Sequence, residues 1–299
     1  MTNNKSKDEL LRINEYCHKN KIAFIAGDTP GLFGYIFVDL GDEFVVTDPD
    51  GEPPKTCYIE GITKDEYGIV SVVESARHDL EDGDVVRITE VQGMTELNGR
   101  EFKVTVKGPF QFAIGDTRSY GDYVKGGFVE QVKVPKSHYF KPLAEFFGKS
   151  PSMDKVLLSD YSKFDRVEQY HLYVQGLLSF TQKYGRPPKP HNEAEAAEVV
   201  ELCKAANEAL GDSKIEKLNT ELLTKMAKTA AGDVSPMAAF FGGIIAHEVI
   251  KATSTKHTPI NQWFFFDTLE CLGPDPLSEE ECAPIGSRYD GQIAIFGKK

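Results

Sequence analysis

The spacing of apolar residues divides the chain into stretches of helical and of strand character. Residues 6–20 carry apolar side chains at helical spacing and predict a helix. Short strands are predicted at 22–26 and at 32–40, where the run LFGYIFVDL is rich in aromatic and β-branched residues. Because this second run is rich in such residues, we expect it to be a buried strand.

From about residue 44 to residue 134 the pattern is that of an all-β region. Short apolar runs recur between turn signals such as Asp82-Gly83-Asp84, Asn98-Gly99 and Gly108-Pro109. Asn98-Gly99 is the strongest hairpin signal, because both central residues of a type I′ turn need positive φ. Strands this short at this spacing predict a small closed or partly closed β-barrel.

After Pro135 the apolar residues recur at helical spacing. Asn192 is the expected N-cap of one of the helices, and Gly185 is expected to end the helix before it. Together the helical segments predict a small helical bundle. The predicted segments are 142–147, 153–158, 163–184, 192–210 and 215–226.

Ser235-Pro236 predicts the start of a further helix, which continues to about Ala252. Its apolar residues lie on nearly two sides, so we expect the helix to be well buried. Gly242-Gly243 inside it costs about 1 kcal/mol per glycine relative to alanine, which favours close packing on a neighbour. The run from Gln262 to Asp267 contains the only tryptophan and predicts a strand.

The charge of the chain limits its possible partners. It has 46 acidic and 34 basic residues and a formal net charge of −12, which argues against non-specific binding to nucleic acid or to an anionic membrane. No apolar run approaches the roughly 20 residues needed to cross a bilayer, and the polar N-terminus shows no secretory signal. Five cysteines without C-x-x-C spacing indicate a reducing compartment, the cytoplasm or the nucleus.

The sequence predicts no catalytic residue and no metal site. Cys17-His18 is the one adjacent pair of cysteine and histidine, but neighbours on a helix point about 100° apart. The seven histidines lack a zinc-binding spacing, and Asp82-Gly83-Asp84 lacks the remaining ligands of a calcium loop. No G-x-G-x-x-G or Walker loop is present, so nucleotide binding by this chain alone has no support.

An ordered series of motifs along nearly the whole chain resembles the eukaryotic ubiquitin-activating enzyme. Any one of these motifs would be weak, but their order is specific. They include Gly31-Leu32-Phe33-Gly34, Glu90-Val91-Gln92-Gly93-Met94, Gly185-Arg186-Pro187-Pro188, Glu248-Val249-Ile250-Lys251-Ala252, Leu269-Glu270-Cys271-Leu272 and Arg288-Tyr289-Asp290-Gly291-Gln292.

The resemblance implies an α+β multidomain architecture, in which a small β-barrel insertion and a helical bundle are attached to remnants of a Rossmann-like adenylation domain. The expected parts are an inactive adenylation domain segment (1–43), the first catalytic-cysteine half-domain (44–135), a four-helix bundle (136–230), the return to the inactive adenylation domain (231–272), and a connector with the start of the active adenylation domain (273–299). In this family the thioester cysteine lies in the second half-domain, which is not part of this sequence.

The resemblance also implies a function. Such an enzyme, of the ligase class, uses ATP and magnesium to adenylate the C-terminus of ubiquitin and then holds ubiquitin as a cysteine thioester. We expect this chain to be a central fragment that serves as a scaffold and ubiquitin-facing wall, with no cofactor of its own and no activity alone. Its expected partners are ubiquitin, the rest of the enzyme and, through it, ubiquitin-conjugating enzymes. A stand-alone binding module for ubiquitin or another protein, and a purely structural domain, remain alternatives.

Four residues are candidates for a functional role. Arg77, Asp79 and Glu81 lie at predicted turns of the barrel and are candidate ubiquitin-facing residues. By its position in the motif, Arg288 resembles the arginine that one adenylation half directs at the nucleotide site of the other. Packing between the two halves is the alternative role for Arg288. The apolar faces at 32–40 and 237–250 are expected to require partners.

Overall fold

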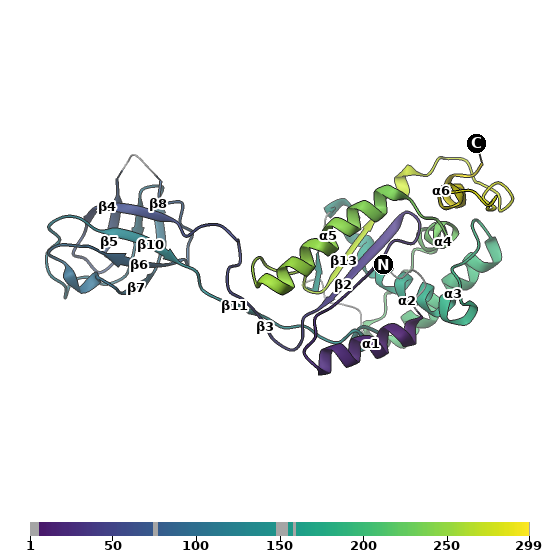
Figure 1. The fold of residues 1–299 in the computed structure, drawn as a ribbon, viewed down its shortest axis with the longest axis horizontal. Coiled ribbons are helices and arrows are strands. Elements are labelled where there is room, and N and C mark those ends of the chain that lie inside the picture. Colours follow the sequence, from purple (N-terminus) through teal and green to yellow (C-terminus); the bar gives the residue numbers. More distant parts are fainter. Residues whose placement is uncertain (1–5, 74–76, 148–154, 158–159, 299) are drawn as a thin grey trace. The chain divides into compact units, whose positions relative to one another are not determined.

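The computed structural model describes residues 6–73, 77–147, 155–157 and 160–298. It has an α+β fold divided into two compact units, unit 1 (residues 1–45 and 137–299) and unit 2 (residues 46–136) (Figure 1). Strands β3 (Phe44–Val46) and β11 (Lys136–His138), which pair with each other, lie where the chain passes from one unit to the other.

Unit 1 is built around a four-stranded sheet with the order β1-β2-β13-β12. The strands are β1 (Phe24–Asp28), β2 (Phe33–Asp39), β12 (Val156–Leu157) and β13 (Trp263–Asp267). Strand β2 is antiparallel to both of its neighbours, whereas β12 is parallel to β13. All seven residues of β2 are buried, which confirms the prediction of a buried strand.

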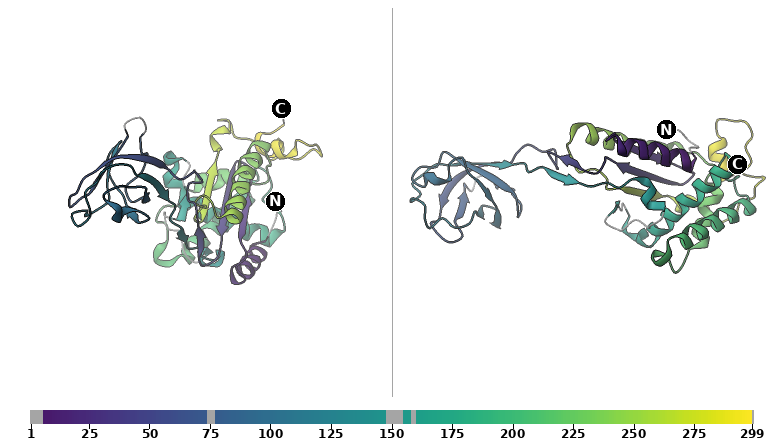
Figure 2. Two further views of the ribbon diagram at one scale, coloured as in Figure 1. Left: turned by 60° about the vertical axis from the view of Figure 1, so that its left-hand side comes forward. Right: turned by 90° about the horizontal axis from the view of Figure 1, so that it is seen from below.

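Two helices cover opposite faces of this sheet, and the alternation of side chains along β2 explains why (Figures 1 and 2). Phe33 points to helix α2 (Val167–Tyr184), where its ring lies 5.4 Å from that of Tyr173. Gly34 faces helix α5 (Ser235–Ser254), and a Cβ at Gly34 would lie 2.4 Å from the ring of Phe241. A glycine is therefore required where α5 crosses β2.

The remaining helices surround this core. Asn192 caps α3 as predicted, since its Oδ1 accepts a hydrogen bond from the amide of Glu195 at 2.9 Å. Gly185 ends α2 with a φ of 68°, also as predicted. The other elements of unit 1 are α1 (Lys7–Lys19), η2 (Leu143–Phe147), η4 (Tyr161–Arg166), α3 (Glu193–Ala209), η5 (Gly211–Ser213), α4 (Thr220–Thr229), η6 (Leu269–Cys271) and α6 (Asp290–Phe296).

Two of the predicted helical segments differ in the structure. The helix predicted at 215–226 begins only at Thr220, because the side chain of Asn207 bonds both the amide and the carbonyl of Ile215 and holds it outside the helix. In the predicted stretch 153–158, residues 156 and 157 form strand β12 and residue 155 precedes it; the rest lies outside the described residues.

The prediction that α5 is well buried is wrong. Only Met237, Phe241 and Glu248 of this helix are buried among the described residues. A Cβ at Gly242 or Gly243 would meet no atom within 4 Å, so no neighbour packs against these glycines. The sequence pattern is apolar on two sides, but the sheet covers only one of them. In contrast, β2 needs no further partner, because both of its faces are covered.

Unit 2 contains a seven-stranded antiparallel sheet with the order β7-β6-β10-β4-β5-β9-β8. The end strands β7 (Glu101–Lys103) and β8 (Thr105–Gly108) are joined by Val104 alone, so they follow each other directly in the chain. No ladder joins these two edge strands in the described part of the unit, so the closed form of the predicted closed or partly closed barrel is not present there. The other strands are β4 (Thr56–Ile62), β5 (Ile69–Val72), β6 (Val85–Thr89), β9 (Gln111–Ala113) and β10 (Phe128–Val132), with η1 (Thr95–Leu97) between β6 and β7.

The turn at Asn98-Gly99 is not of type I′. Asn98 has a φ of −65° and a ψ of 126°, Gly99 has a φ of 77°, and the amide of Arg100 bonds the carbonyl of Leu97 at 3.2 Å, which is a type II arrangement. The side chain of Asn98 bonds both the amide and the carbonyl of Val91. These two bonds fix Asn98 at negative φ and leave the positive φ to Gly99.

Candidate functional site

The three surface candidates share one loop of unit 2, which follows β5. Arg77, Asp79 and Glu81 are exposed, whereas His78 and Leu80 between them are 3% and 6% exposed. The alternation of buried and exposed side chains therefore places the three charged groups on the solvent side of the same loop. The structure brings these candidates together but shows no partner for them.

His78 fastens this loop to the sheet. Its Nε2 lies 2.7 Å from the carbonyl oxygen of Gly108, and its Nδ1 lies 2.9 Å from the amide nitrogen of Leu80. Together these bonds require a neutral imidazole that donates from Nε2 and accepts at Nδ1. The Nζ of Lys55 also donates to the carbonyl oxygen of Asp79. The loop is held by buried contacts while its charges remain free to meet a partner.

Unit 2 carries a concentration of negative charge. Residues 46–136 contain 17 acidic and 11 basic side chains, so this unit accounts for −6 of the net charge of −12 in less than a third of the chain. A surface of this sign favours encounter with a positively charged protein surface.

Arg288 lies in unit 1, just before helix α6. Its side chain is exposed, lies over the ring of Tyr289 at 4.6 Å from the centroid, and donates to the Tyr289 hydroxyl. The turn around it is fixed by Asp290, whose carboxylate accepts hydrogen bonds from the backbone amides of Ile285, Gly286 and Ser287. Hydrogen bonds from these amides lower the pKa of Asp290. Arg288 thus rests on a rigid turn, stacked on its neighbour.

Three of the five cysteines are buried and show little sign of nucleophilic character. Burial raises the pKa of Cys57 to about 11 and that of Cys203 to about 12, and burial followed by the charge of Glu281 raises the pKa of Cys282. These three thiols therefore stay protonated near neutral pH. In the part of the chain that the structure describes, no group of three or more His, Cys, Asp or Glu side chains is placed to hold a metal ion. No helix of that part is long and apolar enough to cross a membrane.

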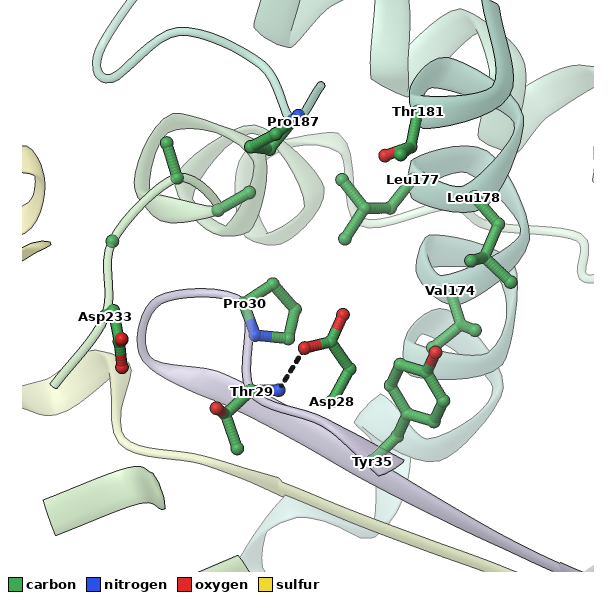
Figure 3. Close-up of a pocket in the computed structure, with 13 residues that line it drawn as sticks. Asp28, Thr29, Pro30, Tyr35, Val174, Leu177, Leu178, Thr181, Pro187 and Asp233 are labelled. Carbon is green, nitrogen blue, oxygen red and sulfur yellow. Dashed lines mark hydrogen bonds between the residues drawn. The ribbon is translucent and has the colours of Figure 1, made fainter. Parts of the chain in front are cut away.

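Sequence reasoning missed a polar cavity of about 180 Å³ in unit 1 (Figure 3). Asp28 at the end of β1 and Asp233 in the α4–α5 loop bring carboxylates to it, and Tyr35 and Thr181 bring hydroxyl groups. The sequence Asp28-Thr29-Pro30-Gly31 is typical of a turn and gives no sign of a binding site. The available signal was an acidic residue at the end of each of two short segments, Gly27-Asp28 and Gly232-Asp233, but only the fold brings them together.

Comparison with known proteins identifies the class of domains. The family model described as the ubiquitin-activating enzyme E1 FCCH domain matches residues 65–133, and that described as the ubiquitin-activating enzyme E1 four-helix bundle matches residues 134–207. The chain therefore combines two domain types of E1 enzymes, both expected from the resemblance of its motifs.

Whole-chain comparison identifies the family. The chain is 44% identical over 301 residues to ubiquitin-like modifier-activating enzyme 1 of Oryctolagus cuniculus, and equally to that of Homo sapiens, across 99% of this chain and 28% of each relative. It is 45% identical over 296 residues to ubiquitin-activating enzyme E1 2 of Arabidopsis thaliana, across 98% of this chain and 27% of that protein. The sequence is that of a segment of a ubiquitin-activating enzyme, and it spans less than a third of the length of the curated relatives it matches.

Proposed function

We propose that this chain is the scaffold and ubiquitin-facing wall of an ATP-dependent ubiquitin-activating enzyme of the ligase class. Its identity of 44% over 99% of its length to ubiquitin-like modifier-activating enzyme 1 is the observation that carries this proposal. In the proposed reaction, the complete enzyme uses ATP and magnesium to adenylate the C-terminus of ubiquitin and transfers the acyl group to a cysteine. Ubiquitin-conjugating enzymes are the proposed recipients, and the cytoplasm and the nucleus are the proposed locations.

Within that enzyme, we assign unit 2 the role of the first catalytic-cysteine half-domain. The exposed side chains of Arg77, Asp79 and Glu81 face ubiquitin in this proposal. Its support is that His78 and Leu80 fix the loop, so that binding need not order it. The acidic charge of the unit further favours a partner with a basic face.

The sheet of unit 1 belongs, in this proposal, to an inactive adenylation domain that contributes no nucleotide site of its own. Strand β2 runs antiparallel to both of its neighbours, β1 and β13, so the proposed Rossmann-like arrangement needs further strands beside this sheet. Arg288 is assigned to packing between adenylation halves, which agrees with its exposed position on a rigid turn. The proposal also holds that the isolated chain neither adenylates ubiquitin nor forms a thioester.

The test compares the isolated chain with a complete enzyme that contains it. With ATP, magnesium and labelled ubiquitin, the complete enzyme is expected to give an adduct that thiol reductants remove, and the isolated chain none. A reductant-sensitive adduct on the isolated chain would overturn the assignment of the chemistry to other parts.

The ubiquitin-facing loop is tested by charge reversal in the complete enzyme. Arg77→Glu and Glu81→Lys are expected to raise the KM for ubiquitin while the KM for ATP stays unchanged, because the loop contacts ubiquitin rather than nucleotide. Glu60→Lys, an exposed position on β4, is the matched control. If all three substitutions change the KM for ubiquitin equally, or if none of them changes it, the loop is excluded as a contact of ubiquitin.

A further inference from the structure

The cavity of unit 1 is built by two turns that the backbone fastens together. Asp28 and Tyr35 are directly opposite each other in the pairing of β1 with β2, so their side chains share one face of the sheet. The amide of Gly31 in the turn between these strands donates to the carbonyl oxygen of Gly232 at 3.0 Å. This bond brings the loop that carries Asp233 against the turn that carries Asp28.

Close packing makes this arrangement specific. Gly31 has a φ of 65°, and a Cβ at this position would lie 2.1 Å from the carbonyl oxygen of Thr229. A Cβ at Gly232 would lie 2.2 Å from the side chain of Ile295 in α6. The two loops cannot move apart without losing these contacts, so the cavity is preformed.

Two hydroxyl groups face the cavity without a partner. Tyr35 is 6% exposed and Thr181 is 8% exposed, so both side chains are more than nine-tenths buried. Neither hydroxyl makes a hydrogen bond to another described residue, and both line the cavity (Figure 3). The two hydroxyl oxygens are not closed off within the protein but open to the cavity, so both are available to bond a polar ligand there.

The cavity also has uncompensated negative charge. Asp28 accepts a hydrogen bond from the amide of Thr29 at 2.8 Å, but none of the thirteen described residues that line the cavity is basic. Burial raises the pKa of Asp28, and the negative charge of Asp233 raises it further, against the effect of the Thr29 bond. A cation in the cavity would relieve this repulsion.

The remaining walls of the cavity are mostly apolar. Val174, Leu177 and Leu178 of α2 form one side, and Pro30 and Pro187 lie across from them (Figure 3). Such walls suit the aliphatic stem of a long basic side chain, whose charged head would reach the carboxylates.

We propose that this cavity binds the side chain of an arginine presented by a partner polypeptide. The guanidinium group carries five donors in a planar fork, and Asp28, Asp233, Tyr35 and Thr181 provide oxygen acceptors for it. A lysine has the same charge, but its three donors share one nitrogen atom and cannot span the separate acceptors, so it is expected to bind more weakly. A metal ion fits less well, because the cavity provides two carboxylates and is several water volumes in size.

A second cavity extends the site. Asp28, Tyr35 and Leu178 also line a cavity of about 340 Å³, whose other walls include Leu10 of α1 and Ile245 of α5. A polypeptide that places an arginine against Asp28 therefore has space for an apolar residue next to it. This proposal concerns unit 1 alone and is independent of the ubiquitin-facing loop.

The first experiment titrates four probes into the full chain and follows backbone amide chemical shifts by NMR. The probes are L-arginine amide, L-lysine amide, L-citrulline amide and magnesium chloride. Arginine amide is expected to give saturable shifts at Gly31 and Gly232, lysine amide a weaker response, and the uncharged citrulline amide none. An equal response to citrulline, tighter binding of lysine, or no saturable response to arginine would overturn the proposal. If magnesium shifts the same amides at a lower concentration than arginine amide does, the cavity is a metal-ion site and the proposal of an arginine is wrong.

The second experiment uses variants that keep the shape of the cavity. Asp28→Asn retains an oxygen for the Thr29 amide and is expected to weaken arginine binding at least about tenfold, because a charge-assisted bond is lost. Tyr35→Phe removes only the hydroxyl and is expected to weaken it about threefold to tenfold. Asp212→Asn, at an exposed position in η5, is the matched control. Unchanged affinity in Asp28→Asn, with the chain folded by its amide spectrum, would overturn the proposal.

Discussion

His18, near the end of α1, lies against the buried carboxylate of Asp39 at the end of β2, with its Nδ1 2.9 Å from Oδ1 of Asp39. Asp39 is 1% exposed and also accepts hydrogen bonds from the side-chain amide of Asn14 at 2.7 Å and from the backbone amide of Gly41 at 3.0 Å. A buried carboxylate with this many donors joins the N-terminal helix to the sheet of unit 1.

The His18 interaction makes the stability of unit 1 depend on pH. Burial lowers the pKa of His18, but hydrogen bonds and charges from Asp39 and Asp42 outweigh it, so the pKa of His18 is raised above its usual value. When the pKa of a histidine is raised in the folded state, its protonation stabilises the fold. This contribution is fully present at a pH below the unfolded-state pKa of about 6.5, and it is lost as the pH rises through the folded-state pKa. Urea unfolding of the chain and of His18→Gln is expected to show a stability gap that narrows on going from about pH 5.5 to about pH 8.5. A gap independent of pH would contradict this linkage.

The two carboxylates beside His18 are expected to differ strongly in their effect. Asp39→Asn places an amide where several donors converge, and we expect it to lower the free energy of unfolding by about 3 kcal/mol or more. Asp42 also meets the ring, at 3.1 Å from Nε2, but its side chain is 92% exposed. Asp42→Asn is therefore expected to change stability by less than about 0.5 kcal/mol. Chemical denaturation measures both, and similar losses would show that burial does not decide the effect.

The sequence predicted the helices and strands of unit 1 better than it predicted which of their faces are buried. Strand β2 was predictable because a continuous apolar run has few alternatives to a covered central strand. The apolar residues of α5 predicted a buried helix, yet Val249 and Ile250 are 47% and 57% exposed. A pattern records which faces avoid water, but not whether the partner that covers them lies within the same segment of chain.

Local signals failed where distant contacts decide the backbone. Asn98 takes negative φ because its side chain bonds Val91, a residue outside the turn itself. The candidate loop was predictable from its polar turn residues, but the role of His78 in fastening it was not, because Gly108 is distant in sequence. The cavity at Asp28 was missed for the same reason, since Asp233 reaches it only through the contact of Gly31 with Gly232.

Gly34 faces α5, and Gly242 lies within that helix. Substitution by alanine is expected to change the free energy of unfolding in opposite directions at these two positions. At Gly34 the added Cβ would lie 2.4 Å from the ring of Phe241, and we expect a loss of about 1–3 kcal/mol from overpacking. At Gly242 the Cβ meets no atom within 4 Å, and alanine is expected to gain about 0.5–1 kcal/mol in helix propensity. Unfolding of the isolated chain measures both signs. A loss at Gly242 would mean that a neighbour covers α5 in solution.

The loop that carries the surface candidates is expected to loosen when His78 is removed. His78→Ala deletes the acceptor of the Leu80 amide, so hydrogen exchange at that amide is expected to accelerate at least about tenfold. Arg77→Ala is the control, because the exposed side chain of Arg77 is not part of these bonds. Exchange at Leu80 that is equally slow in both variants would show that other contacts hold the loop.

Asp28 is expected to lower stability near neutral pH. The pKa of Asp28 is raised by burial and then by Asp233, so the folded state holds the proton over a pH range in which the unfolded state has released it. Stability therefore falls as the pH rises from the unfolded pKa of about 3.9 through the folded value, and stays lowered above it.

Asp28→Asn lacks this penalty and keeps an oxygen for the Thr29 amide, so its Tm at neutral pH is expected to exceed that of the unsubstituted chain. The rise should be about 2–4 °C for each kcal/mol of penalty removed and should vanish at acid pH, where Asp28 is protonated in both states. Asp212→Asn, which is exposed, is expected to show no such trend. An Asp28→Asn variant that is less stable than the unsubstituted chain at neutral pH, but not at acid pH, would mean that the ionised carboxylate already has a cationic partner.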